Sequence, residues 1–245
     1  MSEMRTEEIM IAVIAHMLSG LSHVAVGASS PIPGSAALLA RELSGGALRV
    51  SLLGRATSPT FTDGARELFD CAAQGRIDAF FLSGAQIDGQ ANINLVSIGN
   101  PDKPTTRFPG SFGSAYLYYV VPRVILFRQE HSPRSLVSKV DYVSAPGVSE
   151  PNVYRPGGPY ALVTGRCVFG FDKEKKCFEL ESLHPGQSLD DIKRETGFIF
   201  DSPGGSTIPE TEAPSSEWLE LIRGPVGDDI CEVYPEFAKK MFGAN

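Results

Sequence analysis

The stretch "HVAVGASSPIPGSAALLAREL", residues 23–43, decides the fold of this chain. It opens with a mostly apolar run of strand length that ends at Gly27. A turn rich in Ser and Pro then enters a segment rich in Ala and Leu, which favours a helix. A short buried strand followed directly by a helix is the repeating unit of a parallel sheet covered by helices.

The same unit recurs along the first half of the chain. Two further strand-like runs are "LRVSLLG" at 48–54 and "IDAFFLSG" at 77–84. Between them, "FTDGARELFDCAAQG" is typical of a helix that stops at Gly75, and a helix capped by Thr6 precedes the first strand. This alternation predicts an α/β fold, an open and mostly parallel sheet with helices on both faces.

The second half is richer in strands. The strand-like segments are "VPRVILF", "KVDYVSAP", "ALVTGRCVFGFD" and "CFELESLHP", and "FDKEKK" predicts a hairpin turn between the last two. "SLDDIKRETGF" predicts a helix that is capped by Ser188 and stops at Gly197. A loop over 201–216 leads to a closing helix, "SEWLELIRG". Without repeats or a clear linker, residues 1–245 are expected to form one domain.

The composition limits the possible functions. Apolar residues make up 42% of the 245 residues and the formal net charge is −7, which argues against a nucleic-acid-binding surface. The four cysteines and four histidines lack metal-ligand spacing, so we expect free thiols and no metal site. No signal peptide and no apolar run near the ~18 residues of a membrane span are visible, so a soluble, cytoplasmic protein is expected.

Three loops are candidate ligand sites, because ligands of open α/β sheets bind beyond the carboxyl ends of the strands. They are "GASSPIPG" at 27–34, "GRATSP" at 54–59 and "SGAQIDGQANINLVSIG" at 83–99. None carries a nucleotide-binding fingerprint. Their candidate binding residues are Ser29, Ser30, Arg55, Gln86, Asp88 and Asn92. The polar side chains of the third loop could instead form an Asx-rich hairpin that holds its own backbone.

A fourth candidate lies in "RFPGSFGSAYLYYVVPRVILF", residues 107–127. Gly110, Ser111 and Gly113 precede a long apolar run. Glycine lets backbone amides approach a ligand closely, and amides exposed ahead of an element can hold an anion or a developing oxyanion. The structural alternative is a tight turn between two core elements.

The order of the motifs resembles a known family. It runs through the third loop, "KPTTRFPGSFGSA", "KVDYVSAPG", "ALVTGRCVFGFD" and "LHPGQSLDDIKRETGF", and is similar to the β subunit of class I coenzyme A transferases, of the glutaconate CoA-transferase type. The resemblance covers nearly the whole chain. It implies an enzyme that takes coenzyme A thioesters as substrates, has no permanently bound cofactor, and pairs this chain with an α-type subunit, as α2β2, with the active site at their interface.

The resemblance also implies roles for the glycine-rich loop. In the family this loop lies beside the reacting thioester, and the residue matching Gly113 donates its amide to the oxyanion hole. The family pattern is Gly-Ser-Gly-Gly, and this chain has Phe112 in place of the first paired glycine. A benzyl group at that position would narrow or desolvate the acyl pocket. Arg55 could bind a carboxylate or a phosphate of coenzyme A, or be a solvated surface arginine.

The chain departs from the family at its second strand. Transferases of the family carry a glutamate there that attacks the thioester and becomes a glutamyl-CoA thioester. Counting back from Gly54 places Leu52 at this position, and counting forward from Gly27 places Ser51 there. Ser51 has no histidine at motif distance, although a spatial neighbour or the α chain could supply a base.

Three hypotheses follow from the resemblance. The first is an acyl-CoA enzyme with altered chemistry, since relatives without the glutamate include ring-opening hydrolases of CoA-linked steroid fragments and decarboxylases of glutaconyl-type CoA esters. The second is a transferase whose nucleophile comes from elsewhere in the assembly. The third is a non-catalytic subunit that supports an active α chain.

Overall fold

The computed structural model describes residues 4–57, 61–203 and 207–243, and the chain divides into two compact units. Residues 1–81 with 212–245 form the first unit, and residues 82–211 form the second. Each unit has its own buried apolar residues. The single domain expected from the sequence stays a prediction.

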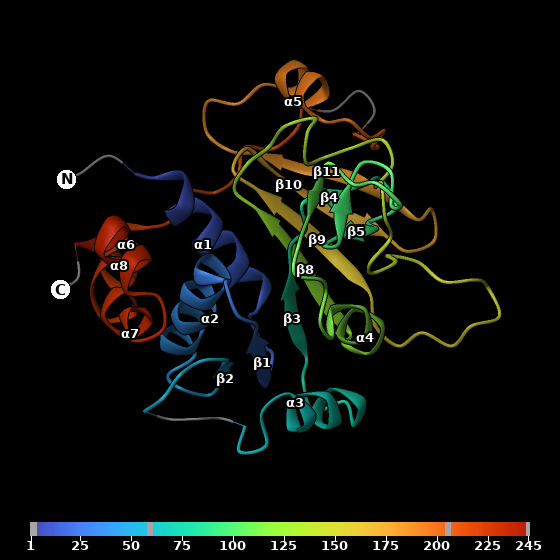
Figure 1. Ribbon diagram of the computed structural model, residues 1–245. Coiled ribbons are helices and arrows are strands. Elements are labelled where there is room, and N and C mark those ends of the chain that lie inside the picture. The colour runs from blue at the N-terminus through green and yellow to red at the C-terminus, as the bar shows by residue number, and fades with distance from the viewer. Residues whose placement is uncertain (1–3, 58–60, 204–206, 244–245) are drawn as a thin grey trace. The chain divides into compact units, whose positions relative to one another are not determined.

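The first unit is a parallel α/β assembly (Figure 1). Strand β1 (His23–Val26) lies between β2 (Arg49–Leu52) and β3 (Ala79–Leu82) and pairs in parallel with both. The helices before the third strand are α1 (Thr6–Met17), α2 (Pro31–Leu43) and α3 (Gly64–Ala73). The C-terminal helices are α6 (Ser216–Leu221), a π-helical segment η1 (Ile222–Val226), α7 (Gly227–Cys231) and α8 (Pro235–Phe242).

Close packing and one buried ion pair hold these helices to the unit. A Cβ on Gly34 of α2 would lie 2.8 Å from Cδ1 of Ile230 in α7, so the two helices approach closely at this glycine. On α1, Glu8 is 1% exposed and accepts hydrogen bonds from the Arg223 guanidinium at 2.6 and 2.9 Å. A buried charge needs such a partner, and this one fastens α1 to η1.

The second unit combines a mixed sheet with two small hairpins. In the order β11-β10-β9-β8, β8 (Arg123–Arg128) and β9 (Pro159–Thr164) are parallel, while β10 (Cys167–Asp172) and β11 (Cys177–Leu183) continue antiparallel. The hairpins are β4 (Gln86–Ile87) with β5 (Ile93–Asn94), and β6 (Ser97–Ile98) with β7 (Thr106–Arg107). The helices are α4 (Ser114–Val120) and α5 (Leu189–Glu195).

Most of the helices and strands predicted from the sequence are confirmed. The first three strands, the helices between them, the hairpin turn after β10 and the helix capped by Ser188 occur where expected, and Ser188 accepts a hydrogen bond from the Asp191 amide. Among the described residues, no helix is long and apolar enough to cross a membrane, and no group of three metal-binding side chains occurs.

Three local predictions were wrong, and helices at two places were not predicted. The first helix begins at Thr6 rather than being capped by it, because the Glu8 carboxylate accepts the Arg5 amide at 2.8 Å. Residues 139–146 form no strand, since several of their amides donate elsewhere, as described below. The run at 161–172 is split at Gly165 into β9 and β10. The closing helix is followed by α7 and α8, and α4 stands where only an apolar run was recognised.

Two buried histidines join the end of β9 to its surroundings in the second unit. The His131 ring lies between the Thr164 and Thr196 hydroxyls, each at 2.9 Å. Nε2 of His184 donates to the Thr164 carbonyl, so its Nδ1 accepts from the Thr211 hydroxyl, both at 2.9 Å. Burial, followed by the nearby Arg166 and His184 charges, lowers the pKa of His131 to about 4.

This burial predicts acid sensitivity. A histidine whose pKa is depressed in the folded state stays neutral there while the unfolded chain takes up a proton, so stability falls as the pH drops from about 6.5 toward 4. For His131 the loss amounts to about 3 kcal/mol at the end of this range. We expect His131→Gln to flatten the decline of the free energy of unfolding between pH 7 and 4.5, measured by urea denaturation. An unchanged slope would contradict the prediction.

Candidate functional site

The loop after β1 is braced by a tyrosine from the C-terminal segment. The Ser30 amide donates to the Tyr234 hydroxyl at 3.2 Å, and that hydroxyl donates to the Gly27 carbonyl at 3.1 Å. Ser30 is buried and its hydroxyl donates to the Ala28 carbonyl at 3.2 Å. Ser29 is exposed and has a left-handed φ of 56°. Of the two predicted binding serines, only Ser29 therefore presents its side chain to solvent.

Ser51 has the histidine that the sequence could not place beside it. The register of β1 and β2 pairs Ala25 with Ser51, and the Ser51 hydroxyl lies 2.7 Å from Nε2 of His23. Nδ1 of His23 donates to the Arg76 carbonyl at 2.7 Å, so Nε2 of the neutral ring accepts from Ser51. Burial is the largest effect on the pKa of His23 and lowers it, which favours this neutral state.

The pair has the hydrogen bonding of a nucleophile and base but lacks access. Ser51 is 0% exposed and His23 is 7% exposed. A serine must reach its substrate to attack it, whereas the Ser51 hydroxyl is fully buried within the first unit. Leu52, the other residue counted to the family's glutamate position, is 4% exposed and has no reactive atom.

Arg55, predicted to bind a carboxylate or a phosphate, already has carboxylate partners within its own unit. It forms a short ion pair with Asp229, and its Nε lies 3.4 Å from Oε2 of Glu232. Its side chain is only 11% exposed, so it is not a solvated surface arginine either. Glu232 also accepts hydrogen bonds from the Ala56 amide and from the amide and hydroxyl of Thr57, at 2.8–3.0 Å. Ser58 and Pro59 of this predicted loop lie outside the described residues.

The polar side chains of the loop at 83–99 bind backbone groups, as expected for the Asx-rich hairpin that the sequence left open as an alternative. The Asp88 carboxylate accepts the amides of Gln90 and Asn92, both at 3.1 Å, and the Val140 amide at 3.4 Å. Asn92 donates to Asp88 at 3.1 Å and accepts the Gly147 amide. These bonds tie the β4–β5 hairpin to residues 140–147.

Gln86 extends the same arrangement. Its side chain accepts from Asn94 at 2.8 Å and from the Asp141 amide at 2.9 Å, and it donates to the Asp141 carboxylate at 3.1 Å. Gln86 and Asp88 are 6% and 4% exposed. Gln86, Asp88 and Asn92 are thus brought together, and they organise the loop rather than presenting free polar groups.

The glycine-rich loop is a strained hinge ahead of α4. Gly110 has a φ of 111° and Phe112 one of 46°. The Ser111 carbonyl accepts from the Ser114 amide at 2.9 Å and from its hydroxyl at 2.6 Å, which closes the turn. Gly113 is the N-cap of the helix, and Phe112 is 83% exposed. A left-handed φ at a bulky residue is costly, and such strain concentrates at functional sites.

The predicted site residues thus form two groups. Ser29, Ser30, Ser51 and Arg55 belong to the first unit, and the β4–β5 loop and the glycine-rich loop belong to the second. Sequence reasoning missed the residues that brace the first group, namely His23, Asp229, Glu232 and Tyr234. Three of these lie more than 170 positions from their partners, and no local pattern reports such pairing.

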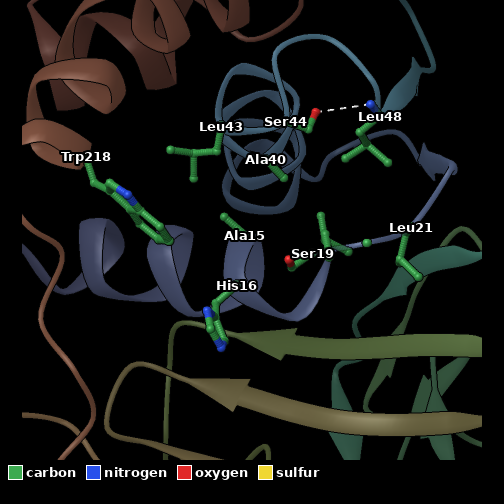
Figure 2. Close-up of a pocket in the computed structure, with 11 residues that line it drawn as sticks. Ala15, His16, Ser19, Leu21, Ala40, Leu43, Ser44, Leu48 and Trp218 are labelled. Atoms are coloured by element: carbon green, nitrogen blue, oxygen red, sulfur yellow. Dashed lines mark hydrogen bonds between the residues drawn. The ribbon is translucent and has the colours of Figure 1, made fainter.

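A separate hollow of about 180 Å³ lies between α1 and α2 beside Trp218 of α6 (Figure 2). Its lining is mostly apolar, with Ala15, Ala40 and Leu43 from the two helices. His16 and Ser44 add polar atoms, and the Ser44 hydroxyl accepts the Leu48 amide at 3.1 Å. Because it lies where the chain enters β1 and β2, this hollow is at the amino ends of the strands, opposite the predicted ligand loops of this unit.

The coenzyme A transferase family model matches residues 9–195, and the chain belongs to this family. Over 150 residues it is 35% identical to the β subunit of the glutaconate CoA-transferase of Acidaminococcus fermentans, covering 58% of this chain and 54% of that protein. Over 162 residues it is 30% identical to the cholesterol ring-cleaving hydrolase IpdB subunit of Rhodococcus jostii, covering 64% of this chain and 62% of that protein. The chain thus spans less than two thirds of the length of these curated relatives.

The fold agrees with a solved structure of the family. The glutaconate coenzyme A-transferase of Acidaminococcus fermentans matches with a TM-score of 0.80 at 24% identity, covering 98% of each chain. The predicted α/β fold with a mostly parallel open sheet is therefore confirmed. The expected likeness to the β subunit of a class I enzyme is confirmed as well.

The strain at Phe112 can be measured. Phe112→Gly and Phe112→Ala both remove the ring, but only glycine adopts a left-handed φ without cost. We expect the glycine variant to have a free energy of unfolding about 1 kcal/mol higher than the alanine variant, measured by urea denaturation. Equal stabilities would mean that the loop relaxes to an ordinary φ once the ring is gone.

Proposed function

We propose that the chain is the β-type subunit of a two-subunit enzyme that acts on acyl-CoA thioesters. The observation that carries the proposal is the hinge at Gly110–Gly113, which has two left-handed residues and turns the backbone directly before α4. Backbone amides held in such a turn stabilise the oxyanion that develops when a thioester carbonyl is attacked or enolised. Gly113 is the proposed amide donor, and Gly110, Ser111 and Phe112 shape the acyl side of the site.

Exposed aromatic side chains near this hinge support a partner subunit. In the second unit Phe112 and Tyr154 are each 83% exposed, and Tyr116 of α4 is 42% exposed. The Tyr119 hydroxyl forms a short hydrogen bond with the Tyr154 carbonyl, which brings the Tyr154 segment against α4. Large exposed aromatic groups mark interaction surfaces, and the proposed occupant is an α-type subunit of the same family, in an α2β2 assembly.

The end of β2 favours a second, narrower candidate function, in which the acyl-CoA is hydrolysed at a carbon–carbon bond or decarboxylated rather than used for CoA transfer. Transfer through a covalent carrier needs an accessible carboxylate. Ser51 and Leu52 are buried, and the two carboxylates that approach the following loop, Asp229 and Glu232, are held by Arg55 and loop amides. The similarity to a ring-cleaving hydrolase subunit agrees with this candidate.

Reconstitution tests the proposed function. The chain alone should turn over no acyl-CoA, and adding an α-type subunit from the same source should give activity on at least one member of a panel of aliphatic, dicarboxylic and polycyclic acyl-CoA thioesters. Gly113→Pro removes one amide donor and should lower kcat by ~10²–10³-fold in the complex. Circular dichroism checks that the variant folds.

Two outcomes would contradict the proposal. Turnover by the isolated chain would overturn the two-subunit assembly, and a complex without activity on the whole panel would overturn the acyl-CoA function. The products separate the two candidate chemistries, because only transfer places coenzyme A on a second acid.

A further inference from the structure

A small cavity of the second unit is lined by cationic side chains. It has a volume of about 180 Å³ and lies between the loop that leads into β9 and the turn of the β10–β11 hairpin. Arg155, Lys173 and Lys176 line it, with Glu150 as its one carboxylate. In a chain with a formal net charge of −7, such a concentration of positive charge is unusual and indicates an anionic ligand.

Arg155 is the most informative of these residues. Its guanidinium donates to the Gly157 carbonyl at 3.1 Å, to the Ser149 hydroxyl at 3.4 Å and to the Tyr118 carbonyl at 3.0 Å. It also lies 5.2 and 5.8 Å from the ring centroids of Tyr118 and Tyr119. All these partners are neutral, and within the described parts of the chain Arg155 forms no ion pair.

The positive charge of the half-buried Arg155 is not balanced by a carboxylate among the described residues, so one negative charge is needed to neutralise it. A guanidinium carries five N–H donors, and only three hydrogen bonds are made, so two donors remain for a ligand. Burial lowers the pKa of Arg155, which reflects the cost of its desolvated charge. Part of its role is to stabilise the C-terminal end of α4, where a cation is favoured.

The two lysines complete the cavity from another element. Lys173 and Lys176 belong to the turn between β10 and β11, and neither forms an ion pair in the ranges that the structure describes. Lys175, in the same turn, pairs instead with Glu179 and with Asp201, the latter at 3.3 Å, and does not line the cavity. Charges from two separate elements thus converge on one small space.

We propose that this cavity is a phosphate-binding subsite, in which the free donors of Arg155 and the ammonium groups of Lys173 and Lys176 hold a phosphate or diphosphate group. Arginine forms paired hydrogen bonds with phosphate oxygens, and lysine adds point charge. The cavity is smaller than the ~300 Å³ of a site for a whole drug-sized ligand, so it suits a terminal group of a larger molecule.

The position of the cavity indicates which molecule supplies the phosphate. Arg155 contacts the C-terminal end of α4 through the Tyr118 carbonyl. The glycine-rich loop precedes the beginning of the same helix (Figure 1). The seven residues of α4 span about 10 Å. Coenzyme A carries its phosphates at the far end of a long arm from its thioester, so one molecule could place its carbonyl at the loop and a phosphate in the cavity. The assignment of the phosphate to coenzyme A rests on the proposed function. Binding of a free phosphorylated metabolite would not depend on that function.

Calorimetric titration of the full chain, alone and in complex with its α-type subunit, tests the subsite. The probes are coenzyme A, pantetheine and inorganic diphosphate. We expect the double variant Lys173→Gln/Lys176→Gln, and separately Arg155→Gln, to weaken binding of coenzyme A and diphosphate about 10-fold while leaving pantetheine unchanged. Lys193→Gln, which removes the same charge from an exposed position of α5, is the matched control and should bind like the parent chain.

The outcomes separate the subsite from the proposed function. Weaker binding of diphosphate but not of coenzyme A would keep the phosphate subsite and assign it to a free phosphorylated ligand. Coenzyme A that binds the parent and all variants equally, with no diphosphate binding, would overturn the subsite and leave the proposed function intact. Diphosphate binding that depends on the three cations, without any binding of coenzyme A, would keep the subsite and contradict the proposed function. Binding of neither probe would overturn both.

Discussion

The parallel pairing of β1 with β2 is the constraint on which the account of this protein depends. It sets Val26 opposite Leu52 and Ala25 opposite Ser51, and so it brings Ser51 within reach of the His23 side chain in β1. With this register Ser51 points to His23 inside the unit, where its hydroxyl satisfies a ring nitrogen that would otherwise be buried without a partner. Leaving a buried polar group without its partner lowers the free energy of unfolding by about 1–3 kcal/mol. The end of β2 therefore contributes to the stability of the unit.

The C-terminal segment also stabilises the loops that follow β1 and β2. Tyr234 fixes the loop after β1, while Asp229 and Glu232 hold Arg55 and the amides that follow β2. The lone pairs of these carboxylates are engaged by cations and amides, and the bonds to Thr57 and Ala56 lower the pKa of Glu232. A carboxylate that is stabilised in this way is a weaker nucleophile. The proposed chemistry of the chain therefore rests on the backbone turn before α4, which belongs to the second unit.

The sequence predicted what local patterns encode. The strand–turn–helix stretch at 23–43 identified the α/β fold, because apolar runs, glycine stops and helix caps act within a few residues. The predictions from the sequence failed where contacts between distant residues determine the local structure. Residues 139–146 alternate like a strand, but the amides of Val140 and Asp141 donate to the side chains of Asp88 and Gln86. Pairing with β5 is limited to one isolated bridge between Ala145 and Ile93.

Three further features were missed, the first for a local reason and the other two because they depend on long-range contacts. The aromatic and β-branched run "YLYYVV" favours a strand by propensity, yet the turn at Gly113 starts a helix there. The serine at the end of β2 was recognised as a departure from the family, but its histidine, 28 positions earlier, could be found only from the register of two strands. No local pattern marked Arg155, because only the structure shows that its partners among the described residues are all neutral.

Whether the end of β2 lacks a nucleophile can be tested directly by searching this chain for a covalent intermediate. The assembled enzyme would be incubated with a substrate acyl-CoA, treated with hydroxylamine or borohydride, and digested for peptide mass analysis. Because the end of β2 offers no accessible nucleophile, we expect that no glutamate or aspartate of this chain is converted to its hydroxamate or alcohol. A modified carboxylate in this chain, at Glu232 above all, would contradict the account and restore the covalent mechanism of the transferases.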